Sequence, residues 1–363
     1  MTPRRFLLAS ATLGQPPVVV QAKHFMGIST KTILLALAGS VAIPASTPDW
    51  FAQQKPLDRL PAEQFDAAAP SALVKGPPGQ MSVRSSACRN LPTGEIRRRI
   101  VNVAVQEWGF FGFSIVDETI QEERSLFRSP ASAGGSRAWS RRPWWRVDPV
   151  EGARVASSIA GYWAATPKGA WMVDRQNGRW KGPAGLASRW RDPWSAAFVS
   201  WVMCEGGLGS SNQFRRSIAH HVYVDQAIRA RDAGSSQAGF TAYDVGETAL
   251  GPGDLLCSSR RGSYGTIAQR RRHLGVAARM HCDVVVKLEP DRKRILAIGG
   301  NVRGTVSLKL LPAALRGGNL APTREIFAHL KLRADAIEDD ALDSSPTARA
   351  VRGTLSSQAI STR

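Results

Sequence analysis

The sequence predicts an α+β fold in which helices come first along the chain and short strands follow. Apolar residues recur at helical spacing in the first part of the chain, whereas short runs rich in Val, Ile and Leu, separated by turn residues, occupy the second part. The composition, with 43% hydrophobic and 21% charged residues, lies in the globular range. Helices followed by strands favour an antiparallel sheet packed against the helices.

The helices are expected in the following places. Apolar residues recur every four positions within 96–108, and a similar pattern within 155–163 ends before Pro167. A third helix should begin at Asp192-Pro193, because Asp is a favoured N-cap and Pro is favoured in the first helical position. Gly206-Gly207 should end this helix. A fourth helix is expected from about 214 to 231.

The strands should follow these helices. Short runs rich in β-branched and apolar residues predict strands at 253–258, 281–288, 294–298 and 305–310. Two stretches rich in Ser, Gly and Arg interrupt the pattern, and we expect them to be loop insertions near residues 121–146 and 259–280.

The N-terminal residues 1–46 resemble a targeting segment. Lys31 precedes an apolar run from Ile33 to Ala45 and small residues that suit a cleavage site, which is the pattern of a secretory signal. The true start is then Met26. The alternative is a twin-arginine signal beginning at Arg4-Arg5. Both interpretations place the protein outside the cytoplasm, in the periplasm or secreted.

The rest of the chain divides into three parts. Residues 47–94 are rich in Pro, Ala, Ser and Gln, which is typical of a linker. Residues 95–335 form the predicted domain, and residues 336–363 form a polar tail that we expect to be disordered. No apolar run long enough to span a bilayer follows the targeting segment, so no integral membrane span is expected there.

The charge of +19 attracts polyanions, but it does not by itself indicate nucleic-acid binding. The arginine runs are short, and aromatic residues are not interleaved with them, as a base-stacking surface would require. Four cysteines in an exported chain permit two disulfides. Because the chain has neither a CxxC pair nor a His/Cys cluster at zinc spacing, we expect no metal and no cofactor.

Ser195 is the candidate nucleophile. With Asp192 as N-cap, it is the third residue of its helix, at the positive end of the helix dipole. Cys204 lies nine residues further along the same helix, on the opposite side, and Cys282 faces away from its neighbour His281 on a strand. No cysteine is therefore placed to act as the nucleophile.

Five segments together resemble a known family. They are 194–201 (WSAAFVSW), the helix with Phe214, His220 and Tyr223, 253–257 (GDLLC), 281–286 (HCDVVV) and 298–302 (IGGNV). In this order they are similar to the bacterial domain of unknown function 2272, and by analogy to the CHAP and NlpC hydrolases, which cut amide bonds of peptidoglycan. The resemblance implies a papain-like fold, in which N-terminal helices pack on a small antiparallel sheet.

The resemblance also implies a catalytic site. Ser195 stands where CHAP enzymes have cysteine, His281 opens the strand that carries their histidine, and Asn301 follows two glycines where their third residue lies. We expect Ser195 and His281 within about 4 Å of each other, with Asn301 on the far side of the imidazole. Trp194, His220 and Tyr223 are the expected substrate-binding residues.

The function that the resemblance implies is hydrolysis of an amide bond in peptidoglycan or a related envelope polymer. The alternative is a catalytically inactive envelope protein that binds glycan or a protein partner in the same cleft. The sequence does not indicate an oligomeric state. In the papain-like plan the strands with Cys257 and Cys282 are antiparallel neighbours, and both cysteines face away from the cleft, which predicts a disulfide between them.

Overall fold

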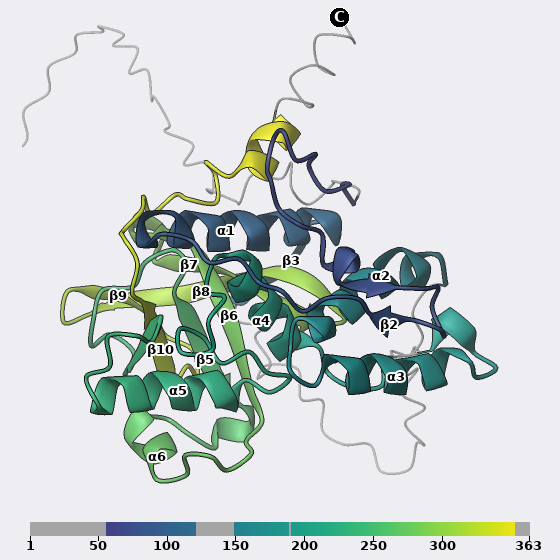
Figure 1. Cartoon of the computed structure of the whole chain (residues 1–363). Coiled ribbons are helices and arrows are strands. Elements are labelled where there is room, and N and C mark those ends of the chain that lie inside the picture. The colour runs from purple at the N-terminus through teal and green to yellow at the C-terminus, as the bar shows by residue number, and fades with distance from the viewer. Residues whose placement is uncertain (1–55, 121–148, 189, 353–363) are drawn as a thin grey trace, which may run out of the picture. The chain divides into compact units, whose positions relative to one another are not determined.

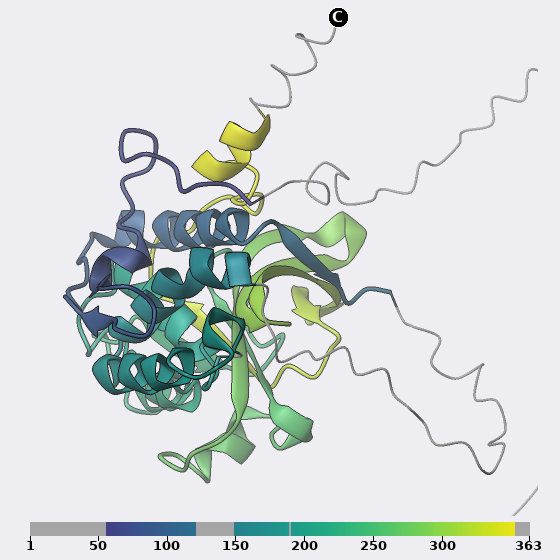
Figure 2. The ribbon, with the colours of Figure 1, turned by 90° about the vertical axis from the view of Figure 1, so that its right-hand side faces the viewer.

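The computed structural model describes residues 56–120, 149–188 and 190–352 (Figure 1). The targeting segment and the insertion at 121–146 lie outside these residues. The described chain has the expected α+β fold, with helices packed on an open multi-stranded sheet and a separate two-stranded sheet. Turning the molecule by 90° shows the helices of the N-terminal half on one side and the strands on the other (Figure 2).

Four of the described α-helices lie where the sequence predicts helices, but the fourth begins at His221 instead of about 214, and the helices at 169–180 and 267–271 are not predicted. The α-helices are α1 (Thr93–Phe110), α2 (Pro149–Ala164), α3 (Gly169–Trp180), α4 (Ser195–Glu205), α5 (His221–Asp232) and α6 (Ile267–Arg271). The prediction that the third helix begins at Asp192 is wrong, since it begins at Ser195 with Trp194 as N-cap. The carboxylate of Asp192 lies 3.2 Å from Arg175 of α3, and it makes this ion pair instead of capping a helix.

The main sheet has eight strands. They are β3 (Ser114–Asp117), β4 (Phe240–Tyr243), β5 (Leu255–Ser259), β6 (Met280–Glu289), β7 (Arg294–Val302), β8 (Thr305–Arg316), β9 (Asn319–Pro322) and β10 (Ala328–Leu332). Their order is β3-β8-β7-β6-β5-β10-β4, and β9 pairs with β8. The pair β3·β8 is parallel, and the other pairs are antiparallel.

The main core lies between the helices and one face of this sheet. Alternate residues of β6, such as Val284 and Val286, point into this core, while Val285 belongs to a smaller apolar cluster on the opposite face. Helix α4 lies at the centre, in contact with α1, α2, β6 and β7. All of its residues are buried, as its almost wholly apolar sequence requires.

Both ends of the domain are more ordered than the sequence indicates. Residues 56–92, expected to belong to a linker, contain the small sheet of β1 (Val74–Lys75) and β2 (Ser82–Val83) and bury Phe65 and Met81. Residues 336–352, expected to belong to a disordered tail, bury Leu342 and Val351 against the core. None of the helices in the described part of the chain is long and apolar enough to cross a membrane.

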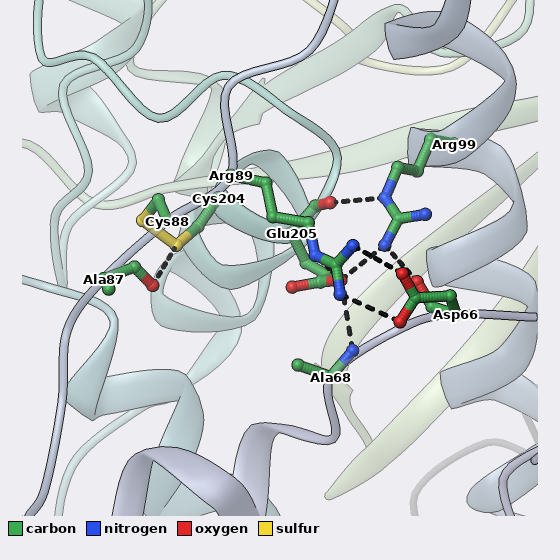
Figure 3. Close-up of polar contacts among 8 residues, drawn as sticks. All are labelled: Asp66, Ala68, Ala87, Cys88, Arg89, Arg99, Cys204 and Glu205. Carbon is green, nitrogen blue, oxygen red and sulfur yellow. Dashed lines mark hydrogen bonds and ion pairs between the residues drawn. A yellow bond between two sulfur atoms is a disulfide. The ribbon is translucent and has the colours of Figure 1, made fainter. Parts of the chain in front are cut away.

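The four cysteines form two disulfides. Cys257 and Cys282 are directly opposed on β5 and β6, with Cα atoms 4.1 Å apart, so the predicted pairing is confirmed. Cys88 pairs with Cys204 near the end of α4. Beside it, Glu205 accepts hydrogen bonds from Arg99 and from the backbone of Ala68 and pairs with Arg89 (Figure 3). This cluster fastens residues 56–92 to α1 and α4.

Candidate functional site

Ser195 is the first residue of α4, and its neighbours fix its position. The side chain of Trp194 is fully buried and stacks on Phe111 and Tyr162. The first hydrogen bond inside the helix runs from Phe198 N to Trp194 O, so the amides of residues 195–197 have no acceptor within the helix. The hydroxyl of Ser195 therefore lies at the positive end of a helix whose first amides are free of helical bonds.

The partner of Ser195 is His220. Ser195 Oγ and His220 Nε2 lie 2.7 Å apart, and the other ring nitrogen, Nδ1, is hydrogen-bonded to the hydroxyl of Tyr223. These three residues form a hydrogen-bonded chain of serine, histidine and tyrosine. The loop between α4 and α5 brings His220 back to the start of α4, and two hydrogen bonds between Ser200 and Ser217 tie it to α4.

Burial keeps this chain of residues uncharged. Desolvation, reinforced by the positive charges of His281 and Lys309, lowers the pKa of His220 well below its ordinary value. Desolvation also raises the pKa of Tyr223 well above its ordinary value, with a contribution from Asp283. At neutral pH His220 is therefore a neutral imidazole, which can accept a proton from the serine.

His281 lies beside His220 in a different environment. The two ring centroids are 5.3 Å apart, but His281 Nε2 is bonded to Asp283 Oδ1 at 2.8 Å. Asp283 Oδ2 in turn accepts a hydrogen bond of 2.8 Å from Lys309 Nζ on β8. Burial raises the pKa of Asp283, but the hydrogen bonds and charge interactions with His281 and Lys309 outweigh this effect, and the pKa falls far below its ordinary value. His281 Nδ1 has no hydrogen-bond partner among the described residues.

The two glycines that follow β7's apolar run make this packing possible. A Cβ at Gly299 would lie 2.0 Å from Asp283 Oδ1 and 3.0 Å from His281 Nε2. A Cβ at Gly300 would lie 2.5 Å from the Cβ of Phe198 on α4. The backbone of β7 thus comes close both to the His281–Asp283 pair and to the helix that carries Ser195, and only glycine leaves enough room.

The observed hydrogen bonds differ from the triad expected from the sequence. The hydroxyl of Ser195 is bonded to His220, not to His281, and the group that orients His281 is Asp283, not Asn301. Asn301 lies at a bulge at the end of β7 with φ of 57°, a left-handed conformation that asparagine tolerates better than most residues. Its identity is thus explained by the turn.

The expected substrate-binding residues are all buried. Trp194 is 0%, Tyr223 1% and His220 4% exposed, so Trp194 packs the core, and the other two belong to the hydrogen-bonded chain. Asp283 and Lys309 were not singled out from the sequence. The signal for Asp283 is its spacing of two residues from His281, which places both side chains on one face of the strand.

The Gly253-Asp254 turn, which belongs to another of the family-like segments, has a structural role. Asp254 is buried and accepts hydrogen bonds from Arg97 at 2.8 Å and from the backbone of Leu332 at 2.9 Å, and it pairs with His329 at 2.8 Å. These contacts join α1, β5 and β10. No group of three or more His, Cys, Asp or Glu side chains in the described residues is arranged to hold a metal ion.

These features define an α+β protein with a helix-terminal serine hydrogen-bonded to a buried neutral histidine. The family model of DUF2272, described as an uncharacterized protein conserved in bacteria, matches residues 139–336, more than half of the 363 residues. The chain belongs to this bacterial family. No curated protein and no solved structure matches the chain.

Proposed function

We propose that the protein is a hydrolase of amide bonds in the cell envelope, with Ser195 as nucleophile and His220 as general base. The observation that carries the proposal is the 2.7 Å contact between Ser195 Oγ and Nε2 of a histidine that burial keeps neutral. A serine is activated when a base lies within hydrogen-bond reach of its hydroxyl and a third group orients that base.

The reaction follows from this geometry. His220 Nε2 takes the hydroxyl proton as Ser195 Oγ attacks the carbonyl carbon, and the carbonyl oxygen becomes an oxyanion. The amides at the start of α4 stabilise this charge. The hydroxyl oxygen of Tyr223 accepts a hydrogen bond from Nδ1–H of the imidazolium, and the nearby carboxylate of Asp283 favours its positive charge. The imidazolium then protonates the leaving amine, and a water molecule releases the acyl group by the same steps.

The arrangement of elements supports a papain-like fold. The candidate nucleophile begins a helix that packs on an antiparallel sheet, and His281 lies near the start of the strand β6. In the papain-like plan the strand histidine is held by a third polar residue and faces the nucleophile. Here Asp283 holds Nε2, and Nδ1 has no hydrogen-bond partner in the part of the chain that the structure describes. We infer that His281 belongs to the same site as a second imidazole.

The proposed location is the periplasm or the exterior, and the proposed substrate is peptidoglycan or a related wall polymer. Two disulfides, both with a buried cysteine, support an oxidising compartment. The substrate class rests on the resemblance to the CHAP and NlpC hydrolases. Mass spectrometry of a non-reduced digest of the protein from its native host tests the compartment, because both disulfides should be found intact.

Release of peptide fragments from purified peptidoglycan tests the activity. The Ser195→Ala variant should lose release by a factor of about 10³ or more. Ser200→Ala is the matched control, because Ser200 is also a buried serine of α4 but is bonded to the loop at Ser217. Equal activity of Ser195→Ala and the unmodified protein would refute the proposed nucleophile.

A second candidate function is a non-catalytic envelope protein that binds a wall polymer or a protein partner. The observation that favours it is burial, since Ser195 is only 9% exposed. A fluorophosphonate, which modifies activated serines, separates the two functions. Labelling of Ser195 that depends on His220 supports the hydrolase. Retention of the protein on peptidoglycan without labelling and without fragment release supports the binding protein.

A further inference from the structure

The insertion between β5 and β6 carries an unusual distribution of charge. This segment, the basic arm (residues 260–279), contains six arginines and no acidic residue. It comprises a short 3-10 turn and α6, and Figures 1 and 2 both show it projecting beyond the sheet next to α5. It returns to the sheet at Met280, directly before His281.

The tip of the basic arm is built rigidly. Arg270 is 0% exposed, and its guanidinium binds both carboxylate oxygens of Asp225 on α5 at 2.7 Å and the carbonyl of Val276 at 2.8 Å. The amide of Gly275 also donates to Asp225 at 2.8 Å. A buried ion pair is thus used to hold the tip in one conformation. This arrangement presents a defined surface to the outside.

Three exposed arginines of the basic arm make no ion pair with an acidic side chain among the described residues; these are Arg260, Arg272 and Arg279. Arg271 of the same arm pairs with Asp232 at 2.8 Å. Exposed arginines elsewhere in the described chain are either paired, as Arg98 is with Glu338 at 2.6 Å, or unpaired, as Arg84 and Arg316 are. The basic arm differs in that its unpaired arginines lie together in one segment that has no acidic residue.

The tip also exposes an apolar side chain. Val276 is 57% exposed, and Gly275 and Ala277 on either side are exposed as well. A soluble polyanion explains the free arginines but not this apolar tip. Exposed arginines on the same segment as an exposed apolar side chain fit the interface of an anionic membrane, where the arginines meet headgroups and the valine reaches the acyl boundary.

We propose that the basic arm docks the protein on a membrane surface rich in anionic lipid. Docking holds the segment next to His281 at the bilayer, so the candidate site faces substrates that lie between membrane and wall. The docking surface does not depend on the hydrolase proposal, since it is measured as binding.

A fluorescent probe on the tip tests the docking directly. No free cysteine is found among the described residues, so Val276→Cys in the full chain offers a single thiol for an environment-sensitive label. Its emission should shift to the blue with vesicles of equal parts phosphatidylcholine and phosphatidylglycerol, but not with pure phosphatidylcholine. A label at Arg303→Cys, in the β7–β8 turn, should not shift. No shift at position 276, or equal shifts at both positions, would overturn the proposal.

Two charge-matched variants of the labelled chain test the arginines. The first combines Arg260→Gln, Arg272→Gln and Arg279→Gln, and it leaves the buried Arg270 intact. The second combines Arg84→Gln, Arg316→Gln and Arg349→Gln, which lie outside the basic arm. Each interfacial arginine strengthens binding about fivefold, so the first variant should need about a hundredfold more anionic lipid for the same shift. An equal loss of binding to anionic vesicles in both variants would contradict a specific docking surface and would indicate non-specific charge attraction.

The apolar tip separates a membrane from a soluble polyanion. Val276→Ser should weaken sedimentation with the anionic vesicles and leave retention on soluble polyphosphate unchanged. The vesicle binding of Val276→Ser is compared with that of Val150→Ser. Val150 is also highly exposed, at 79%, but it belongs to α2 and lies outside the basic arm. Tighter binding to polyphosphate than to vesicles, with no effect of Val276→Ser, would replace the membrane by an anionic polymer.

Discussion

Two histidines lie side by side in the candidate site, and their surroundings are opposite. His220 is buried at 4% exposure and is bonded only to hydroxyl groups, those of Ser195 and Tyr223. The side chain of His281 is 23% exposed and is bonded to a buried carboxylate, which Lys309 also contacts. The first imidazole is held neutral, whereas the second is part of a charged cluster.

The comparison shows that proximity alone does not assign chemical roles. A general base must be unprotonated and must contact the group that it deprotonates, and His220 meets both conditions. His281 is instead hydrogen-bonded to Asp283, and it makes no hydrogen bond to Ser195 among the described residues. The charges of the His281–Asp283–Lys309 cluster also reach His220, where they oppose one another: His281 and Lys309 lower its pKa, and Asp283 raises it.

The largest expected effect comes from removing each histidine in turn. His220→Gln should lower kcat/KM for fragment release about 10²- to 10⁴-fold, because it removes the base that contacts Ser195. His281→Gln should have a smaller effect, because His281 does not bond Ser195. Kinetics of both variants on the same substrate measure the difference. A larger loss for His281→Gln would restore the triad expected from the sequence.

The charged cluster should matter most for stability. Lys309→Met leaves the carboxylate of Asp283 buried with one partner fewer, which costs about 3 kcal/mol of the free energy of unfolding. Adding Asp283→Asn removes the buried carboxylate that has lost Lys309 as a partner, and it should restore part of that stability. Urea unfolding of the two single variants and the double variant measures the coupling. Strictly additive losses would mean that Lys309 and Asp283 do not stabilise each other.

Gly299 should be the most sensitive glycine of the site. Gly299→Ala places a methyl group 2.0 Å from Asp283 Oδ1, so the strand must shift, at a cost of about 2 kcal/mol. Gly178→Ala is the control, because nothing lies within 4 Å of its added Cβ, and it should stabilise α3 by about 0.5 to 1 kcal/mol. A stability of Gly299→Ala equal to that of the unmodified protein would contradict the close packing of β7.

The smallest effects should appear as a dependence of stability on pH. Both His220 and Asp283 have a pKa lowered by folding, so the unfolded chain binds protons more readily, and stability falls as the pH is lowered. For His220 the loss begins near its ordinary value of 6.5, and for Asp283 near 3.8. Urea midpoints should therefore fall below about pH 6.5 in the unmodified protein. His220→Gln should reduce that upper slope and leave the part that comes from His221, whose pKa is also lowered by burial, and it should keep the slope below about pH 4.

The sequence predicts many of the elements but not the partner of Ser195. Apolar periodicity indicates α1, α2 and the strands β5 to β8, because each buries one continuous face, whereas α3, β3, β4 and β10 are not predicted. The strand order that the family resemblance implies, together with side-chain alternation, predicts the Cys257–Cys282 disulfide. The choice between two histidines depends on the path of the loop between α4 and α5. That path is set by long-range contacts, such as those of Ser200 with Ser217, which leave no periodic signal.

The ends of the domain were misjudged for a related reason. Residues 56–92 have little regular structure, and they are held by ion pairs and side-chain contacts, such as that of Arg59 with Glu107 at 2.6 Å. Composition cannot distinguish such a segment from a linker. Asn301 was assigned from the family pattern, although its backbone conformation is a sufficient reason for asparagine there.

The two disulfides differ in the time at which their second cysteine is made. Cys282 follows Cys257 by 25 residues, whereas Cys204 follows Cys88 by 116. At roughly 5 to 20 residues per second, Cys88 waits about 6 to 23 seconds for its partner, whereas Cys257 waits only a few seconds. The loop that the Cys88–Cys204 disulfide closes contains α1, α2 and α3, so this disulfide can form only after these helices and most of α4 have been made.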